Sequence, residues 1–77
     1  MPHTQPTISC LIVDDEQMSR TIMERFVEQT DMLYLKKSCK DSTEALRILN
    51  NERVDLLLLD IEMPEMNGFE LLRGLEH

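Results

Sequence analysis

Three aspartates are the candidate reactive residues of this chain, because they stand directly after its apolar segments. Asp14 and Asp15 come after residues 8–13, "ISCLIV", and Asp60 comes after the four leucines of residues 56–59. If the two segments are neighbouring strands, the three carboxylates converge at one sheet edge, where their repulsion favours binding of a cation. Oxygen ligands with room for water suit Mg²⁺ better than Zn²⁺.

A carboxylate supported by a metal ion can also act as a nucleophile. Asp60 would attack a phosphoryl group and form an acyl phosphate, while Mg²⁺ would neutralise the phosphoryl oxygens. The alternative is that these acidic residues only end strands and cap helices. For Asp15 alone the two interpretations are equally good, whereas three carboxylates at one edge favour the functional one.

The strands that must position these aspartates follow from the hydropathy pattern. Residues 8–13 combine apolar and β-branched residues in a short run, which predicts a strand buried on both faces. A second strand is predicted at residues 32–38, at the edge of the sheet because it carries Lys36 and Lys37. A third apolar strand is predicted at residues 54–59.

Amphipathic helices separate these strands. The first is predicted at about residues 16–30, with Asp15 as its cap. Its apolar residues recur at helical spacing and predict a stripe that packs into the core. This stripe consists of Met18, Ile22, Phe26 and Val27.

Two further helices follow the second and third strands. Asp41 and Glu44 form a capping-box pattern that begins a helix ending at about residue 51. Its predicted buried positions are Ala45, Ile48 and Leu49. The last helix begins at Gly68, with Leu71, Leu72 and Leu75 predicted on one face.

The alternation of strands and helices predicts an α/β fold with a parallel sheet and helices on both faces. Ligands of such sheets bind at the carboxyl ends of the strands, where the strand order reverses. Asp14, Asp15 and Asp60 stand at this edge.

Two segments of the sequence resemble a known family. "CLIVDDE" at residues 10–16 and "LLLLDIEMPEMNGFELL" at residues 56–72 are similar to the receiver domain of two-component response regulators. The resemblance covers nearly all of residues 8–75. It implies a flavodoxin-like fold, with the strands of this chain in order 2-1-3. It also implies that Asp60 accepts a phosphoryl group from a histidine kinase.

The same resemblance implies a set of Mg²⁺ ligands. Asp15 and Asp60 would bind the ion directly, together with the backbone carbonyl of Glu62, and Asp14 would act through a metal-bound water. Pro64 stiffens the loop that holds this carbonyl, and Gly68 permits the turn into the last helix.

A full receiver continues with strands four and five, and their Ser or Thr and Lys residues have no counterpart here. We therefore expect a flexible leader at residues 1–7 and a partial receiver at residues 8–77. The third strand would then be an exposed apolar edge that promotes self-association. Residues 38–68 look most like receivers that precede LytTR-type DNA-binding domains, which implies a parent protein that regulates transcription.

Charge and hydropathy exclude some functions for this segment. The net charge of −7 disfavours direct contact with nucleic acid, and no apolar run approaches the ~18 residues of a membrane span. Without a secretion signal, the chain is expected to be cytoplasmic with free thiols. We expect Cys10 to be buried and Cys39 to be semi-exposed.

Three functional hypotheses follow. The leading one is a phosphoacceptor module that is not itself an enzyme. The second is a non-catalytic interaction module that docks on a kinase or another receiver through the helix at residues 16–30. The third is a metal-dependent phosphohydrolase, but such enzymes typically show an Asp-x-Asp arrangement, and here Glu62 stands two residues after Asp60.

Overall fold

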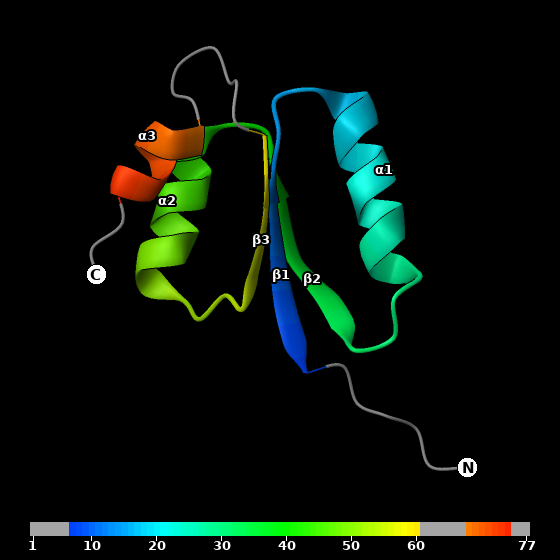
Figure 1. The fold of residues 1–77 in the computed structure, drawn as a ribbon. Coiled ribbons are helices and arrows are strands. Elements are labelled where there is room, and N and C mark those ends of the chain that lie inside the picture. The colour runs from blue at the N-terminus through cyan, green and yellow to red at the C-terminus, as the bar shows by residue number, and fades with distance from the viewer. Residues whose placement is uncertain (1–6, 61–67, 75–77) are drawn as a thin grey trace.

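The computed structural model describes residues 7–60 and 68–74. Strands and helices alternate in the predicted order (Figure 1). Glu62, Leu75 and all of the predicted leader except Thr7 lie outside the described residues. The six elements are β1 (Ile8–Val13), α1 (Gln17–Glu28), β2 (Leu33–Cys39), α2 (Ser42–Asn51), β3 (Leu56–Leu59) and α3 (Gly68–Arg73).

The three strands form one parallel sheet in the order β2-β1-β3, which confirms the predicted fold class and strand order. The central strand β1 has five buried residues in succession, as expected for a strand covered on both faces. The strand β2, which carries Lys36 and Lys37, lies at one edge as predicted. Its register against β1 shifts between Cys10 and Leu11.

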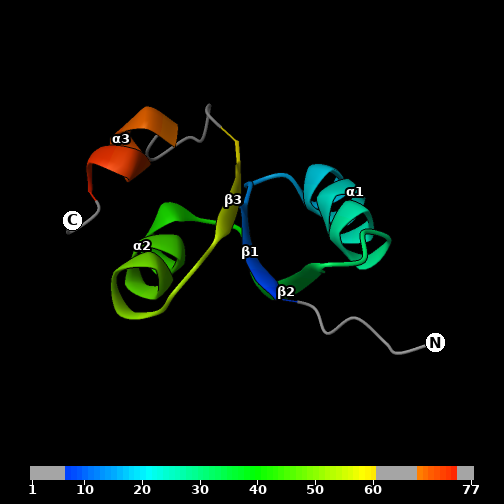
Figure 2. The same cartoon turned by 60° about the horizontal axis from the view of Figure 1, so that its bottom comes forward.

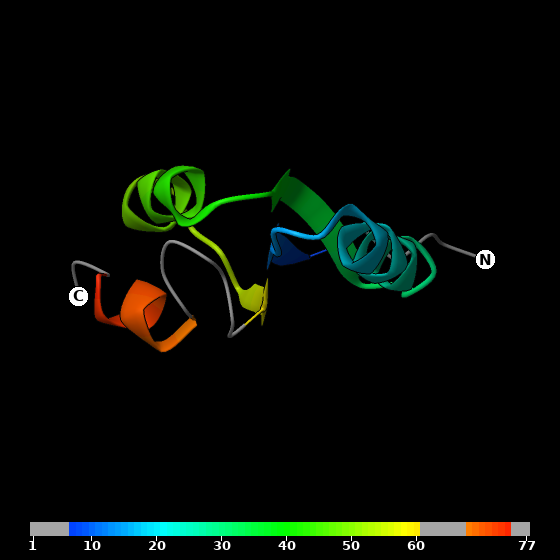
Figure 3. The ribbon, with the colours of Figure 1, turned by 90° about the horizontal axis from the view of Figure 1, so that it is seen from above.

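Helices cover both faces of the sheet. Figures 1 and 2 show α1 on one face and α2 with α3 on the other, and the view from above in Figure 3 separates the same layers. The α1 side buries Cys10, Ile12 and Val27. The α2 side buries a larger cluster made of Leu11, Val13, Cys39, Ala45, Ile48 and Leu71.

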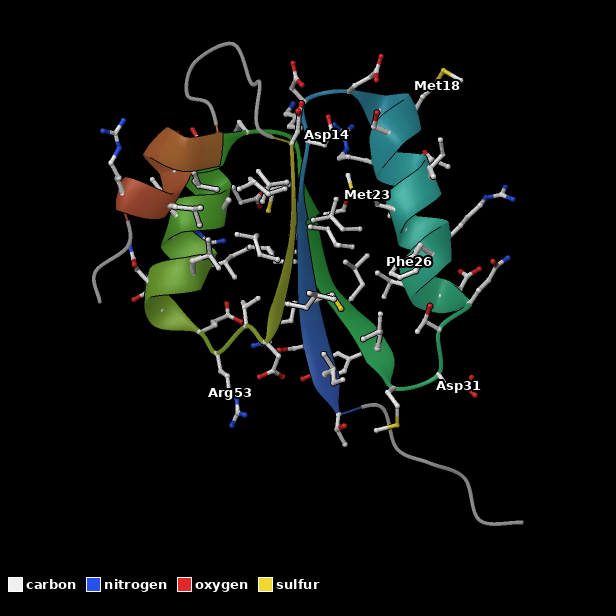
Figure 4. All side chains as sticks on the ribbon, in the orientation of Figure 1. Asp14, Met18, Met23, Phe26, Asp31 and Arg53 are labelled. Carbon is white, nitrogen blue, oxygen red and sulfur yellow. The ribbon has the colours of Figure 1, made fainter. Side chains whose placement is uncertain are left out.

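The predicted core stripe of α1 is wrong in three of its four residues. Val27 is buried, but Met18, Ile22 and Phe26 are 76%, 68% and 53% exposed. The helix instead contacts the sheet through Met23 and Val27, one residue further along the chain. Figure 4 shows Met23 directed toward the sheet and Met18 directed away from it. One step of 100° along a helix is enough to replace one apolar stripe by its neighbour.

Two other predictions need correction. Cys39 is fully buried rather than semi-exposed, because it is the last residue of β2 and packs under α2. Burial raises the pKa of its thiol to about 11, and the negative charge of Glu44 adds to this effect. The N-cap of α1 is Glu16 and not Asp15.

The α2 prediction is confirmed in its start and its buried face. The Asp41 side chain accepts a hydrogen bond from the Glu44 backbone N–H at 3.1 Å. Ala45 and Ile48 are buried, and Leu49 is half-buried. In α3, Leu71 is buried, but Leu72 is 46% exposed, so the predicted common face of the two is wrong. No helix in the described residues is long and apolar enough to span a membrane.

A polar clamp holds the amino ends of β1 and β3 together. The backbone N–H and the hydroxyl of Ser9 both donate to Asp55 Oδ2, at 3.0 and 3.1 Å. The Asp55 N–H donates to the Ser9 carbonyl at 3.0 Å, and Arg53 Nε donates to Asp55 Oδ1 at 3.1 Å. The clamp lies at the opposite end of the sheet from Asp14, as the positions of Arg53 and Asp14 in Figure 4 show.

Candidate functional site

The sheet backbone places two of the predicted site residues side by side. The Asp14 N–H donates to the Cys39 carbonyl at 3.0 Å, and the Asp60 N–H donates to the Val13 carbonyl at 2.8 Å. Both aspartates are therefore held by strand-type hydrogen bonds immediately after their strands end. This pairing follows from the parallel register of β1 with β2 and β3.

The carboxylates of Asp14, Asp15 and Asp60 form one cluster, with one oxygen from each lying within 4.8 Å of the others. Asp14 is 6% exposed, Asp60 is half-buried and Asp15 is exposed, so the cluster opens to solvent on one side. The structure thus brings together three of the four residues expected at the site. The fourth, Glu62, lies outside the described residues.

Two hydrogen bonds within the segment from β1 into α1 hold Asp14 in place. Asp14 Oδ1 accepts a hydrogen bond from the Glu16 N–H at 2.9 Å, and the Arg20 Nη1 atom donates to the Asp14 carbonyl at 2.8 Å. The sequence interpretation did not include Arg20. Its signal was its position three and seven residues before Met23 and Val27, which places it on the face of α1 that contacts the sheet.

The carboxylates of the cluster act on one another electrostatically. Loss of surrounding water raises the pKa of the Asp15 carboxyl, even though the residue as a whole is exposed. A hydrogen bond with the Asp60 side chain and the negative charges of Asp60 and Asp14 raise this pKa further, whereas the backbone N–H lowers it. Three hard oxygen donors in an electrostatically crowded, open position fit a divalent cation such as Mg²⁺.

A second concave region lies elsewhere on the molecule, between α1 and β2. It has a volume of about 320 Å³ and is lined by Glu24, Val27, Glu28, Leu33, Tyr34 and Leu35. None of these residues belongs to the carboxylate cluster. The candidate reactive site is therefore the cluster of Asp14, Asp15 and Asp60 at the carboxyl edge of the sheet, which is separate from this concave region.

Comparison with known proteins agrees with this geometry. Residues 10–77 match the family described as "Response regulator receiver domain". The chain is 43% identical over 68 residues to the transcriptional regulatory protein MalR of Bacillus subtilis, covering 88% of this chain and 29% of MalR. It is 32% identical over 69 residues to the transcriptional regulatory protein BtsR of Escherichia coli, covering 90% of this chain and 29% of BtsR.

A solved structure shares the fold. The crystal structure of the response regulator domain of Thermotoga maritima CheB superposes with a TM-score of 0.80 and 29% sequence identity. The alignment covers 88% of this chain and 51% of that domain, so the chain spans about half of the solved domain. The sheet order, the acidic cluster and the match over residues 10–77 lead to one conclusion: the chain belongs to the response regulator receiver domain family.

Proposed function

We propose that the chain is the phosphoacceptor part of a two-component phosphorelay, in which Asp60 takes a phosphoryl group from a histidine kinase. Receiver domains generally act as phosphoacceptors rather than as enzymes. The observation that carries the proposal is the convergence of Asp14, Asp15 and Asp60 within 4.8 Å at the carboxyl edge of the sheet.

The three aspartates of the cluster would have different roles in the transfer. A carboxylate oxygen of Asp60, which is half-buried at the end of β3, forms a bond to phosphorus while the bond from phosphorus to the donor nitrogen breaks. Asp15 and Asp60 would bind Mg²⁺ directly with the Glu62 carbonyl, and Asp14 would act through a water. Bound there, the ion would neutralise charge on the carboxylates and on the phosphoryl oxygens.

Intact-mass spectrometry after incubation with acetyl phosphate tests this proposal. We expect one added phosphoryl group on the wild-type chain with Mg²⁺, and none after chelation or in the Asp60→Asn variant. Asp31→Asn is the matched control, because Asp31 is an exposed aspartate in the turn between α1 and β2. Labelling that persists in Asp60→Asn would contradict the assignment of Asp60 as acceptor.

The whole protein is proposed to regulate transcription. MalR and BtsR are transcriptional regulatory proteins, and the chain spans 29% of the length of each. With the LytTR-like sequence of residues 38–68, this supports a cytoplasmic regulator whose DNA-binding domain follows the receiver. A full-length protein that shows no specific DNA binding, with or without phosphorylation, would contradict this proposal.

The exposed stripe on α1 favours a second function, that of a docking module. Met18, Ile22 and Phe26 are all more than half exposed, and they recur every fourth residue, which forms an apolar band along one side of the helix. A kinase that docks here should bind Asp60→Asn as well as wild type but lose affinity for Ile22→Lys. The reverse pattern would contradict docking through α1.

Self-association through β3 is a further proposal. Within the described residues β3 pairs with β1 alone, and Leu56, Leu57, Leu58 and Leu59 are all half-buried. An apolar strand with one unpaired edge is a template for pairing with a second copy. Light scattering after size exclusion should give a mass above that of the monomer, and Leu58→Lys should lower it. A wild-type monomer at every concentration would contradict the proposal.

A further inference from the structure

Arg20 makes a contact that the proposed function has not used. It lies near the start of α1 and is half-buried. Its Nη1 atom donates to the backbone carbonyl of Asp14 at 2.8 Å, and its own backbone N–H donates to the Glu16 carbonyl at 3.0 Å. The side chain therefore reaches back across the loop to Asp14, the first residue after β1.

The carbonyl that Arg20 holds belongs to the peptide group joining Asp14 to Asp15. This group is planar, so fixing the direction of its oxygen also fixes the direction of the bond that leads to the Asp15 Cα atom. The Asp14 carboxylate is held separately by the Glu16 N–H at 2.9 Å. Together the two hydrogen bonds orient the Asp14 carboxylate and the backbone from which the Asp15 side chain projects.

Such a restraint is needed because the cluster repels itself. The oxygens of Asp14, Asp15 and Asp60 lie within 4.8 Å of one another, and Asp15 is exposed, so its side chain has room to turn away into water. Among the described residues, the hydrogen bond that the guanidinium makes goes to the backbone oxygen of Asp14. It can thus order the loop without occupying a ligand position.

We propose that Arg20 is a positioning residue for the acidic cluster, because it holds the Asp14–Asp15 peptide in the orientation in which the two carboxylates converge with Asp60 on a divalent cation. The part of this inference that concerns cation binding rests on the proposed function. The part that concerns the ordering of the loop by Arg20 does not depend on the proposed function.

The sign of the effect separates positioning from simple electrostatics. Removing a positive charge beside three carboxylates would by itself strengthen the binding of Mg²⁺. Losing the restraint on the loop would weaken it, and loss of a residue that orients ligands typically lowers metal affinity by roughly tenfold or more. We therefore expect Arg20→Met to bind Mg²⁺ about tenfold more weakly than wild type.

The experiment is a calorimetric Mg²⁺ titration of the 77-residue chain, with Arg25→Met as the matched control. Arg25 is an exposed arginine in the last turn of the same helix, so this variant removes the same charge far from the cluster. Its affinity should stay within about twofold of wild type. A folded Arg20→Met with unchanged or tighter binding would overturn the proposal.

Hydrogen exchange of the Glu16 amide gives a second readout that needs no metal. This N–H is bonded to Asp14 Oδ1, so it should exchange faster in metal-free Arg20→Met and at the wild-type rate in Arg25→Met. If the wild-type chain fails to bind Mg²⁺, the proposed metal site is refuted. The Glu16 amide then still shows whether Arg20 orders the loop, and an unchanged rate would overturn that part.

If Arg20→Met does not fold, Arg20→Lys provides a second test of the proposal. Lysine retains the charge but lacks the planar donor group of arginine, so its Mg²⁺ affinity and Glu16 protection should fall between those of wild type and Arg20→Met. A Lys variant that matches wild type in both measurements, beside an unfolded Met variant, would overturn the proposal.

Discussion

Asp55 shows how one carboxylate can hold a strand in register. It accepts hydrogen bonds from the backbone and the hydroxyl of Ser9, a residue 46 positions away, and it pairs with Arg53. The Ser9 backbone N–H lowers the pKa of the Asp55 carboxyl most, followed by the hydrogen bonds from Arg53 and the Ser9 hydroxyl. The bonds are therefore made to the ionised form.

The pH dependence of stability should reveal this clamp. Because the folded-state pKa of Asp55 is lowered, its contribution is fully present above the unfolded pKa of about 4 and is lost as the pH falls through the folded value. Asp55→Asn should have a lower thermal midpoint than wild type at pH 7, and the difference should narrow below pH 4. Asp31→Asn should show neither effect, and a gap that stays constant with pH would contradict the clamp.

The two thiols should be protected by burial. Cys10 and Cys39 are both fully buried, and burial raises the pKa of each. Thiolate is the reactive form, so at pH 8 both cysteines should react slowly with a thiol reagent in the native chain and rapidly in urea. Fast labelling of Cys39 under native conditions would show that the α2 side of the sheet opens.

At the scale of elements, α1 has one apolar face against the sheet and another facing solvent. Val27→Ala should lower the free energy of unfolding by about 2 kcal/mol, because it removes buried methyl groups and leaves a cavity. Ile22→Ala should change it by less than about 0.5 kcal/mol, because Ile22 is 68% exposed. Urea denaturation of the two variants compares these values, and equal losses would mean that Ile22 is also part of the core.

At the scale of the whole molecule, the proposed cation site should couple cation binding to folding. Mg²⁺ at ten times its dissociation constant should stabilise the wild-type chain by about 1.4 kcal/mol, provided that the unfolded chain does not bind it. Asp15→Asn removes one of three crowded negative charges, so without metal at pH 7 this variant should be more stable than wild type. It should also lose most of the response to Mg²⁺, as thermal unfolding with and without the ion can show.

The order of the elements and the position of the acidic cluster could be predicted from the sequence. Apolar runs and helical periodicity mark strands and helices locally, and parallel strands bring their carboxyl ends to one edge of a sheet. That is why Asp14, Asp15 and Asp60 could be expected together from the sequence. The resemblance to receiver domains implied the strand order 2-1-3, and the two lysines of β2 indicated an edge strand; the sheet confirms both.

Only the tertiary structure decided which face of α1 contacts the sheet and which polar side chains form hydrogen bonds. Periodicity gives the apolar directions of α1 but not the one that contacts the sheet, so the exposure of Met18, Ile22 and Phe26 was missed. The Ser9–Asp55 clamp and the reach of Arg20 to the Asp14 carbonyl depend on strand register and loop geometry. The Ser9–Asp55 bonds join residues 46 positions apart, and such contacts leave no periodic signal in either segment. The Arg20–Asp14 bond spans only six positions, but it depends on the path of the loop between β1 and α1, which periodicity does not give.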